Sequence, residues 1–248
     1  MLFREDPDRD TGRVYPQQPQ HSRGKNGSLT KQAKRVLPVR NIIFDLGGVL
    51  LRWDVDWIIT QVFSEPRTCE LVRREIFQHP DWNELDRGSL TKEQAIRHFV
   101  ERTALPVSDI RKVMEAVKRC LTPLPESMEL LDRLKTEGFQ LYCLSNMHRA
   151  SFAFIRDRFD FWSKLKGILI SAYVGRVKPE PDIFEYFLER FRLNREQTVF
   201  VDDHKPNVEA SQELGIRSVL FTSAAECERQ IHLLARERQA TGDRRKTP

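Results

Sequence analysis

Short runs of β-branched and aromatic residues recur along the chain and predict five buried strands. The first run covers Asn41–Asp45, begins two residues after Val39 and ends at the Gly47-Gly48 pair. The other runs lie at residues 139–145, 167–171, 198–202 and 217–221. Apolar runs of about four to eight residues that end in glycine or polar positions are typical of strands buried on both faces.

Amphipathic helical patterns separate the later runs. They lie at residues 148–158, 181–191 and 207–214, and Gly215 provides a stop signal for the last one. Strands and helices that alternate without hairpin signals predict an α/β fold, with a Rossmann-like parallel sheet and helices on both faces. Sheets of this kind place their active sites beyond the carboxyl ends of the strands.

The interval between the first and second strands breaks this alternation. It holds helical patterns only, at residues 55–63, 68–78, 91–103 and 108–119. Ser89 or Thr91, and then Ser108, are the candidate N-caps of the last two helices. A block of four helices is too large for a simple crossover, so it predicts a helical bundle inserted over the active site as a cap. Pro123 and Pro125 mark the return to the sheet, before one further helix leads into the second strand.

The two ends of the chain differ in composition from its middle. Residues 1–38 are rich in Pro, Gln, Arg and Gly without a sustained apolar period, which predicts a disordered basic leader. We expect a core domain of residues 39–52 and 122–233, a helical cap domain of residues 53–121, and a basic C-terminal tail of residues 234–248.

The excess of basic over acidic residues lies at the two ends of the chain. The formal net charge is +5, with +4 in residues 1–38, +3 in residues 234–248 and −2 in the remainder. The middle of the chain carries no basic excess, so we expect no nucleic-acid partner. No apolar run reaches the ~18 residues of a membrane span, and the charged start of the chain is no signal peptide, so we expect a cytoplasmic protein without a membrane partner. The four cysteines lack C-x-x-C spacing, which argues against a zinc site or a disulfide framework.

Polar residues follow three of the predicted strands, and a lysine stands in a loop near them. They are Asp45 after the first strand, Ser145 and Asn146 after the second, Asp202 and Asp203 after the fourth, and Lys178 before the helix at 181–191. Each of them alone would fit a turn, a helix cap or a solvated loop. Because the carboxyl ends of parallel strands meet at one edge of a sheet, we expect these residues to form one site.

These residue types fit phosphoryl transfer. A strand-end carboxylate such as Asp45 can attack phosphorus and form an acyl-phosphate, which divides a hard hydrolysis into two easier steps. A pair of acids can hold Mg²⁺, which prefers oxygen ligands, and Lys178 adds a second positive charge. The Ser145 hydroxyl and the backbone N–H groups of Gly47 and Gly48 can bind phosphoryl oxygens.

The ordered motifs F-D-L-G-G-V-L, L-S-N, V-K-P-E-P and F-V-D-D resemble those of the haloacid dehalogenase-like superfamily, over about residues 40–222. The inserted helices look like the alpha-helical cap of that superfamily. The segment Trp82–Gly88 is similar to one in the caps of its sugar-phosphate phosphatase branch, and the D-L-G form of the first motif also resembles that branch.

The resemblance implies a Mg²⁺-dependent phosphatase in which Asp45 is both the nucleophile and a metal ligand. It implies that Lys178 steadies the charges, and that the Gly47 carbonyl and Asp203 bind the metal. Asp202 would bind the metal directly or support the groups that do. The expected substrate-binding residues are Ser145, Asn146 and Gly48.

One position departs from the family pattern. Most phosphatases of the superfamily have a second aspartate two residues after the nucleophile, as general acid and base, where this chain has Gly47. Without this acid the reaction rate loses the contribution of general acid catalysis, which is of order 10²–10⁴-fold. The loss matters least when the leaving group is good, and it argues against a phosphomutase. His148 and His204 lie near motif ends and are candidate proton donors, or else exposed or helix-capping histidines.

We therefore predict a hydrolase that acts on a small phosphomonoester, with sugar phosphates as one candidate class, through an aspartyl-phosphate on Asp45. Two alternatives stay open: a metal-free 2-haloacid dehalogenase, which has no use for the Asp-Asp pair, and a non-catalytic binding or regulatory protein. Arg52, Trp53, Asp86 and Arg87 are candidates for specificity by their proximity to the cap or to the first motif. The sequence does not predict the oligomeric state.

Overall fold

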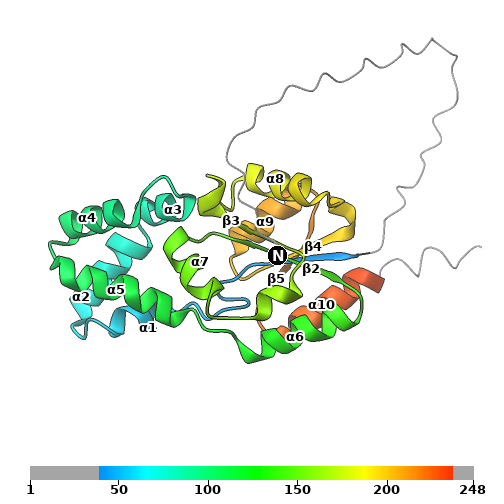
Figure 1. Ribbon diagram of the computed structural model, residues 1–248, viewed down its shortest axis with the longest axis horizontal. Helices are drawn as coiled ribbons and strands as arrows, with labels where there is room; N and C mark the ends of the chain where they lie inside the picture. The colour runs from blue at the N-terminus through cyan, green and yellow to red at the C-terminus, as the bar shows by residue number, and fades with distance from the viewer. Residues whose placement is uncertain (1–38, 237–248) are drawn as a thin grey trace, which may run out of the picture. The chain divides into compact units, whose positions relative to one another are not determined.

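A sheet of five parallel strands forms the centre of the computed structural model, which describes residues 39–236 (Figure 1). The strands are β1 (Asn41–Phe44), β2 (Gln140–Ser145), β3 (Gly167–Ile170), β4 (Thr198–Asp202) and β5 (Arg217–Leu220). Their order across the sheet is β3-β2-β1-β4-β5, so the first strand is central and every neighbouring pair is parallel. The predicted α/β class and the position of each strand are confirmed.

Helices cover both faces of the sheet. They are α6 (Pro125–Thr136), α7 (Arg149–Arg156), α8 (Pro181–Phe191), α9 (Lys205–Glu213) and α10 (Ala224–Arg236). Successive strand side chains point to opposite faces, so Ile42 and Phe44 of β1 pack with α6, α7 and α10, whereas Ile43 packs with α8 and α9. Burial on both faces explains why the strand sequences are apolar throughout.

A block of helices between β1 and β2, here called the helical insertion, has an apolar core of its own. It contains α1 (Val55–Thr60), α2 (Pro66–Val72), the π-helical turn η1 (Arg73–Phe77), α3 (Pro80–Arg87), α4 (Lys92–Thr103) and α5 (Val107–Cys120). Ile58, Phe99 and Met114 are fully buried in this core, which is distinct from the two clusters that line the sheet. A distinct core supports the division into a sheet domain and a cap, whose boundaries stay a prediction.

The insertion differs in detail from the sequence patterns. Helix α3 is not predicted from the sequence, because its two buried apolar residues, Trp82 and Leu85, are too few to give a clear helical period. Thr91 is the N-cap of α4 and forms reciprocal hydrogen bonds with Gln94. The prediction of Ser108 as an N-cap is wrong, because α5 begins at Val107 and Pro106 occupies the N-cap position.

Two adjacent linkers join the insertion to the sheet domain. The Arg52 N–H donates to Thr122 O (2.8 Å), and the Leu124 N–H donates to Leu50 O (3.0 Å), so the outgoing and returning chains run side by side. The outgoing linker follows directly on the loop after β1. The insertion is therefore anchored next to the end of the central strand.

The end of α3 docks on the sheet domain. Arg87 donates to both carboxylate oxygens of Glu180, at 2.5 and 2.8 Å. Gly88 ends the helix with a φ of 85°, and a Cβ at this position would lie 2.5 Å from the Ala172 carbonyl oxygen. A close backbone approach thus fixes the insertion to the sheet domain on this side.

The C-terminal helix continues beyond its predicted limit. Helix α10 ends at Arg236, three residues into the segment predicted as a tail, because Leu234 and Ala235 still pack against the core. The predicted leader, at residues 1–38, and residues 237–248 lie outside the described residues. All four cysteines are free thiols.

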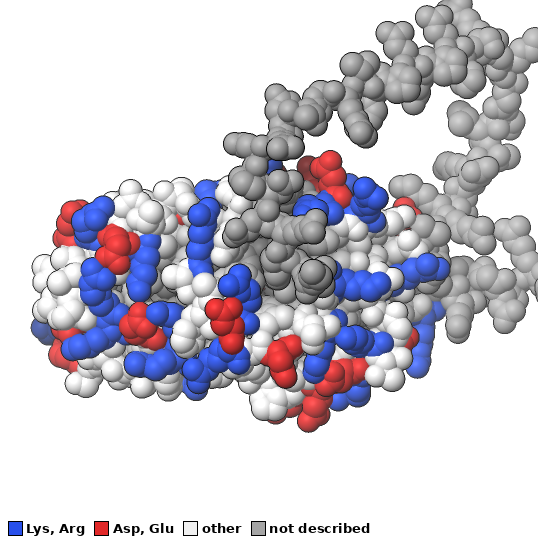
Figure 2. Space-filling model, in the orientation of Figure 1, with Lys and Arg blue, Asp and Glu red and all other residues white. Residues whose placement is uncertain are grey.

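Charged side chains of both signs are interspersed over the face seen in Figure 2. Exposed ion pairs on the described part of the chain include Arg111 with Glu93 (2.6 Å) and Arg133 with Glu228 (2.9 Å). None of the helices within residues 39–236 combines the length and the apolar character that crossing a membrane requires.

Gly88→Ala is expected to lower the free energy of unfolding more than the matched Gly138→Ala. Both glycines have a positive φ, 85° and 92°, at which alanine strains the backbone by about 1–2 kcal/mol. Only at Gly88 would the new Cβ also meet a carbonyl oxygen, because nothing lies within 4 Å at Gly138. Urea unfolding measures both losses, and equal losses would contradict the close docking of α3.

Candidate active site

Asp45 extends β1 to the carboxyl edge of the sheet. Its backbone N–H donates to Val201 O (2.9 Å), which ties it to β4. The side chain is largely buried, and Oδ1 accepts no hydrogen bond from the described residues. Burial raises the pKa of Asp45 to about 7, although the Lys178 ammonium opposes this effect.

The ammonium group of Lys178 is buried between two carboxylates. Its Nζ lies 2.6 Å from Asp202 Oδ2 and 2.8 Å from Asp45 Oδ1, and it donates to Leu144 O at 3.1 Å. The contact with Asp45 is an ion pair without the angles of a hydrogen bond. Burial alone would lower the pKa of Lys178, but the two carboxylates outweigh burial and raise the pKa, so the lysine stays protonated.

The two acids at the end of β4 have different surroundings. The carboxylate of the fully buried Asp202 also accepts from the His204 N–H (2.8 Å) and from the Asn207 amide (3.0 and 3.1 Å). Asp203 lines the cavity and is partly accessible to solvent; the loss of some hydration at its carboxylate and the nearby charge of Asp202 raise its pKa. Asp202 is therefore saturated with donors, whereas Asp203 faces the space in which a ligand would bind.

Gly47 and Gly48, which follow Asp45 closely, differ in whether the backbone requires glycine at their positions. Gly48 has a φ of 76°, and a Cβ there would lie 2.1 Å from Asp203 Oδ2, so glycine is required. The Gly48 N–H donates to Leu51 O (2.8 Å), so the donor predicted to bind a phosphoryl oxygen is already used. Gly47 lines the cavity, has no positive φ, and a Cβ there would only touch Trp53 at 3.5 Å.

Ser145 and Asn146 both line the cavity at the end of β2. The Asn146 side-chain amide donates to Lys178 O, and the Lys178 N–H donates to Asn146 Oδ1, both at 2.8 Å. This reciprocal pair fixes the loop that carries Lys178 to β2. The geometry makes Asn146 a positioning residue, while the predicted contacts of Ser145 and Asn146 with substrate stay predictions.

A cavity of about 360 Å³ lies between the sheet edge and the helical insertion. Its floor is polar and includes Asp45, Gly47, Ser145, Lys178 and Asp203. Its roof comes from the insertion and the outgoing linker, and consists of Trp53, Val55, Phe77, Trp82, Asn83, Asp86, Val117 and Leu121. The roof is largely apolar, and three of its side chains form an aromatic cluster: the Phe77 and Trp82 ring centroids are 4.8 Å apart, and those of Trp53 and Trp82 are 6.0 Å apart.

Asp86 is a buried acid within this roof. Its backbone oxygen accepts from Ser171 Oγ (2.5 Å), and its carboxylate accepts hydrogen bonds from the His148 N–H and the Trp82 side chain. Burial raises the pKa of Asp86 to about 7, and the nearby Asp45 adds to the effect. Asp86 is thus the acid that the insertion contributes to the cavity.

The two histidines near the motifs differ in their roles. The ring nitrogens of His148 contact the N–H (3.3 Å) and the Oγ (2.9 Å) of Ser151, which makes His148 the N-cap of α7. Burial lowers the pKa of His148 to about 4, so its ring is neutral at pH 7. His204 is exposed and lines the cavity.

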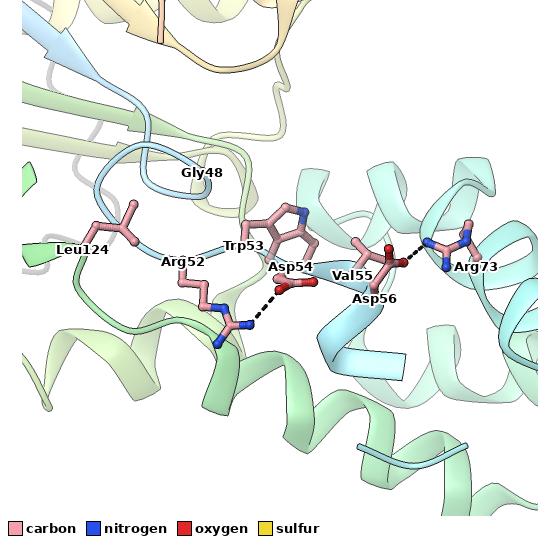
Figure 3. Close-up of a pocket in the computed structure, with 8 residues that line it drawn as sticks. All are labelled: Gly48, Arg52, Trp53, Asp54, Val55, Asp56, Arg73 and Leu124. Carbon is pink, nitrogen blue, oxygen red and sulfur yellow. Dashed lines mark hydrogen bonds and ion pairs between the residues drawn. The ribbon is translucent and has the colours of Figure 1, made fainter. Parts of the chain in front are cut away.

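A second hollow of about 500 Å³ opens beside the outgoing linker (Figure 3), and its lining residues do not include Asp45, Asp202 or Asp203. Arg52 lines this hollow and pairs with Asp54 at 2.7 Å. Among the four specificity candidates, Trp53 and Asp86 line the main cavity, whereas Arg52 and Arg87 do not.

The sequence reasoning missed Asn207, Phe77 and the position of Trp82 in the roof. Asn207 follows Asp202 by five residues and lies in the first turn of α9, so a D-D-x-x-x-N pattern could have identified it. Phe77 carries no such signal, because its place in the roof depends on how the helices of the insertion pack.

The donor set at the floor fits a divalent cation. Carboxylate oxygens of Asp45, Asp202 and Asp203 lie within 4.8 Å of one another, the one acidic cluster of this kind within residues 39–236. Three carboxylates outnumber the single Lys178 ammonium, which Asp45 and Asp202 share. Mg²⁺ prefers such oxygen ligands. Because Asp202 is saturated, the residues that suit the ion are Asp45, Asp203 and the Gly47 carbonyl.

The parallel sheet, the inserted helices and the carboxylate cluster at the strand ends together indicate a hydrolase whose fold is of the α/β class. The chain belongs to the haloacid dehalogenase-like hydrolase family, whose model matches residues 39–215. The resemblance found in the sequence motifs is thereby confirmed, and the chain is an enzyme of the hydrolase class.

Two fungal relatives and one bacterial structure show the extent of the likeness. The chain is 30% identical to the drimenol cyclase of Aspergillus calidoustus over 78% of its own length, but spans only 36% of that protein. It is also 30% identical to the sesquiterpene phosphatase of Aspergillus oryzae, over 75% of this chain and 91% of the relative. A haloacid dehalogenase-family enzyme from Bacteroides thetaiotaomicron, solved with magnesium and inorganic phosphate, shares the fold with a TM-score of 0.62 and 24% identity, over 74% of this chain and 94% of that one.

Asp45→Asn is expected to stabilise the metal-free protein at pH 8. The pKa of Asp45 in the folded protein, about 7, exceeds its usual 3.8, so the folded state loses stability as the pH rises through this interval. Asparagine removes that loss, so we expect the free energy of unfolding to rise by roughly 1–3 kcal/mol. Lys178→Met should do the opposite and cost about 3–5 kcal/mol, because it leaves two buried carboxylates without a cation. Urea unfolding in EDTA measures both changes, and a destabilised Asp45→Asn would contradict the argument.

Proposed function

We propose that this protein is a Mg²⁺-dependent phosphatase that transfers the phosphoryl group of a small phosphomonoester to Asp45 and then to water. The observation that carries the proposal is Asp45 Oδ1, which is buried at the cavity floor and lies 2.8 Å from the Lys178 ammonium. A carboxylate that attacks a phosphate dianion needs neighbouring positive charge. The lysine supplies one charge, and the acidic cluster has the donor set for a second.

The remaining residues of the floor take supporting roles in this proposal. Bound Mg²⁺ would neutralise charge on the phosphoryl oxygens and keep Asp45 ionised. Asp203 and the Gly47 carbonyl would share that ion with Asp45. Ser145 would donate its hydroxyl to a phosphoryl oxygen, and Asp202 would hold the Lys178 ammonium in place.

The roof favours an apolar alcohol as the leaving group. Sugar hydroxyls need hydrogen-bond partners when they are buried, and each unmet partner costs affinity. Among the roof residues, Asn83 and Asp86 offer side-chain oxygens, whereas the others are apolar or aromatic. One relative is named a sesquiterpene phosphatase, which agrees with an apolar substrate. We therefore favour a phosphomonoester of an apolar alcohol over a sugar phosphate.

Asp45→Asn is expected to abolish phosphate release from 4-nitrophenyl phosphate, with a loss of about 10⁴-fold or more, because the nucleophile is removed. EDTA should abolish phosphate release by the unsubstituted protein, and added Mg²⁺ should restore this activity. Asp56→Asn is the matched control, since Asp56 is an exposed acid of α1 outside the cavity. Inorganic phosphate measured by a colour assay reports all of these reactions.

The same preparations test the dehalogenase alternative. With 2-chloropropionate as substrate, we expect no release of chloride in either Mg²⁺ or EDTA. Chloride release that is indifferent to EDTA and lost in Asp45→Asn would overturn the phosphatase proposal in favour of the metal-free reaction. Turnover in neither assay would contradict both.

Phe77→Ala is expected to lower kcat/KM for a prenyl or long-chain alkyl phosphate by roughly 10–200-fold, because it removes one wall of the apolar roof. Hydrolysis of phosphate esters with small leaving groups should change little. Phe63→Ala is the control, since Phe63 packs against the core of the insertion and does not line the cavity. Faster turnover of glucose phosphates than of prenyl phosphates by the unsubstituted protein would show that the leaving group is a sugar.

A further inference from the structure

The missing acid beside Asp45 raises the question of where the leaving alcohol obtains its proton. In an in-line displacement the attacking and leaving oxygens lie on opposite sides of phosphorus. Asp45 attacks from the cavity floor, so the leaving oxygen points to the roof. A proton donor for this oxygen therefore has to come from the insertion.

The described residues that line the cavity offer few titratable groups. They are Asp45, Asp86, His148, Lys178, Asp203 and His204. All of these except Asp86 belong to the sheet domain. His148 has both ring nitrogens engaged with Ser151 and is neutral at pH 7, while His204 follows Asp203 directly on the floor side. Asp86 is thus the one titratable side chain that the insertion places in the described cavity.

We propose that Asp86 is the general acid and base of the reaction, carried by the insertion in place of the acid that Gly47 lacks. The proposal rests on the phosphatase function proposed above. In the first step the bond between phosphorus and the leaving oxygen breaks, a bond between phosphorus and an Asp45 oxygen forms, and the Asp86 carboxyl gives its proton to the departing alkoxide. In the second step the Asp86 carboxylate takes a proton from water, whose oxygen binds phosphorus as the bond to Asp45 breaks. Inorganic phosphate leaves, and both aspartates return to their starting states.

The surroundings of Asp86 suit a group that gives and takes a proton near neutral pH. Burial raises its pKa to about 7, and the negative charge of Asp45 acts in the same direction. Hydrogen bonds from the His148 N–H and the Trp82 side chain, together with the more distant Lys178 ammonium, favour the carboxylate and limit the rise. The hydrogen bond from Ser171 Oγ to the Asp86 backbone oxygen holds the residue against the sheet domain. A pKa close to the working pH is the most effective one for proton transfer in both directions.

The test compares leaving groups of different basicity. For Asp86→Asn we expect kcat/KM for an alkyl phosphate to fall by about 10²–10⁴-fold, because an alkoxide cannot leave unprotonated. For 4-nitrophenyl phosphate we expect kcat/KM to stay within about tenfold, since nitrophenolate needs no proton and kcat/KM reports the first irreversible step. Because the second step then lacks its base, Asp86→Asn should release a burst of nitrophenolate approaching one per protein molecule. Glu84→Gln, on the same helix, is the matched control, since Glu84 does not line the cavity.

The outcomes separate the two proposals. Equal losses of kcat/KM for the alkyl and nitrophenyl esters would overturn the role of Asp86 as an acid, because a structural or binding role affects both esters alike. Unchanged kcat/KM for the alkyl ester would overturn it as well. Retained kcat/KM for 4-nitrophenyl phosphate shows that the variant is folded and that Asp45 still acts. Absence of any metal-dependent phosphate release by the unsubstituted protein would instead overturn the phosphatase function, and the role of Asp86 with it.

Discussion

Burial of the Lys178 ammonium between two carboxylates is the interaction on which the rest of the site depends. A lysine at this depth loses its hydration, and only close anions offset that cost. Asp45 and Asp202 supply them from the neighbouring strands β1 and β4, while Asn146 holds the lysine backbone at the end of β2. Three parallel strands therefore have to end at the same edge for one buried charge to be stable. The arrangement holds an oxygen of Asp45 at the cavity floor beside the buried ammonium, and in the proposed reaction the Asp45 carboxylate would be the nucleophile.

The apolar roof and the charged floor act together. Apolar side chains of the roof cover the charged floor, and electrostatic interactions are stronger where less water is present. The same burial raises the pKa values of Asp45 and Asp86 to about 7. A cation bound at the floor would lower the pKa of Asp45, which it contacts, and would act less on Asp86 across the cavity. Two carboxyl groups with similar burial would then hold different protonation states, one as nucleophile and the other as acid.

The sequence predicts those parts of the structure that depend on local pattern and topology. The strand at Thr198–Asp202 has the bounds expected from its apolar run, because burial on both faces leaves a continuous signal. The meeting of Asp45 with Lys178 follows from the rule that parallel strands end at one edge. The sequence does not show which hydrogen bonds are already used, so the saturation of Asp202 and the engaged N–H of Gly48 emerge only in three dimensions. The roof is equally hidden, since it depends on packing among helices that are distant in the chain.

The backbone does not require glycine at position 47, so the importance of this residue lies in the carboxylate that the position lacks. Its φ is not left-handed, and a Cβ would make an ordinary contact of 3.5 Å with Trp53. A carboxylate at this position would have to extend beside the Trp53 ring, which forms part of the apolar wall. With the acid placed on α3 instead, proton transfer requires α3 to be docked on the sheet domain, through Arg87 and Glu180 among others. In the proposed reaction the alcohol would then receive its proton only when the roof covers it, so exclusion of water and departure of the leaving group would become a single condition.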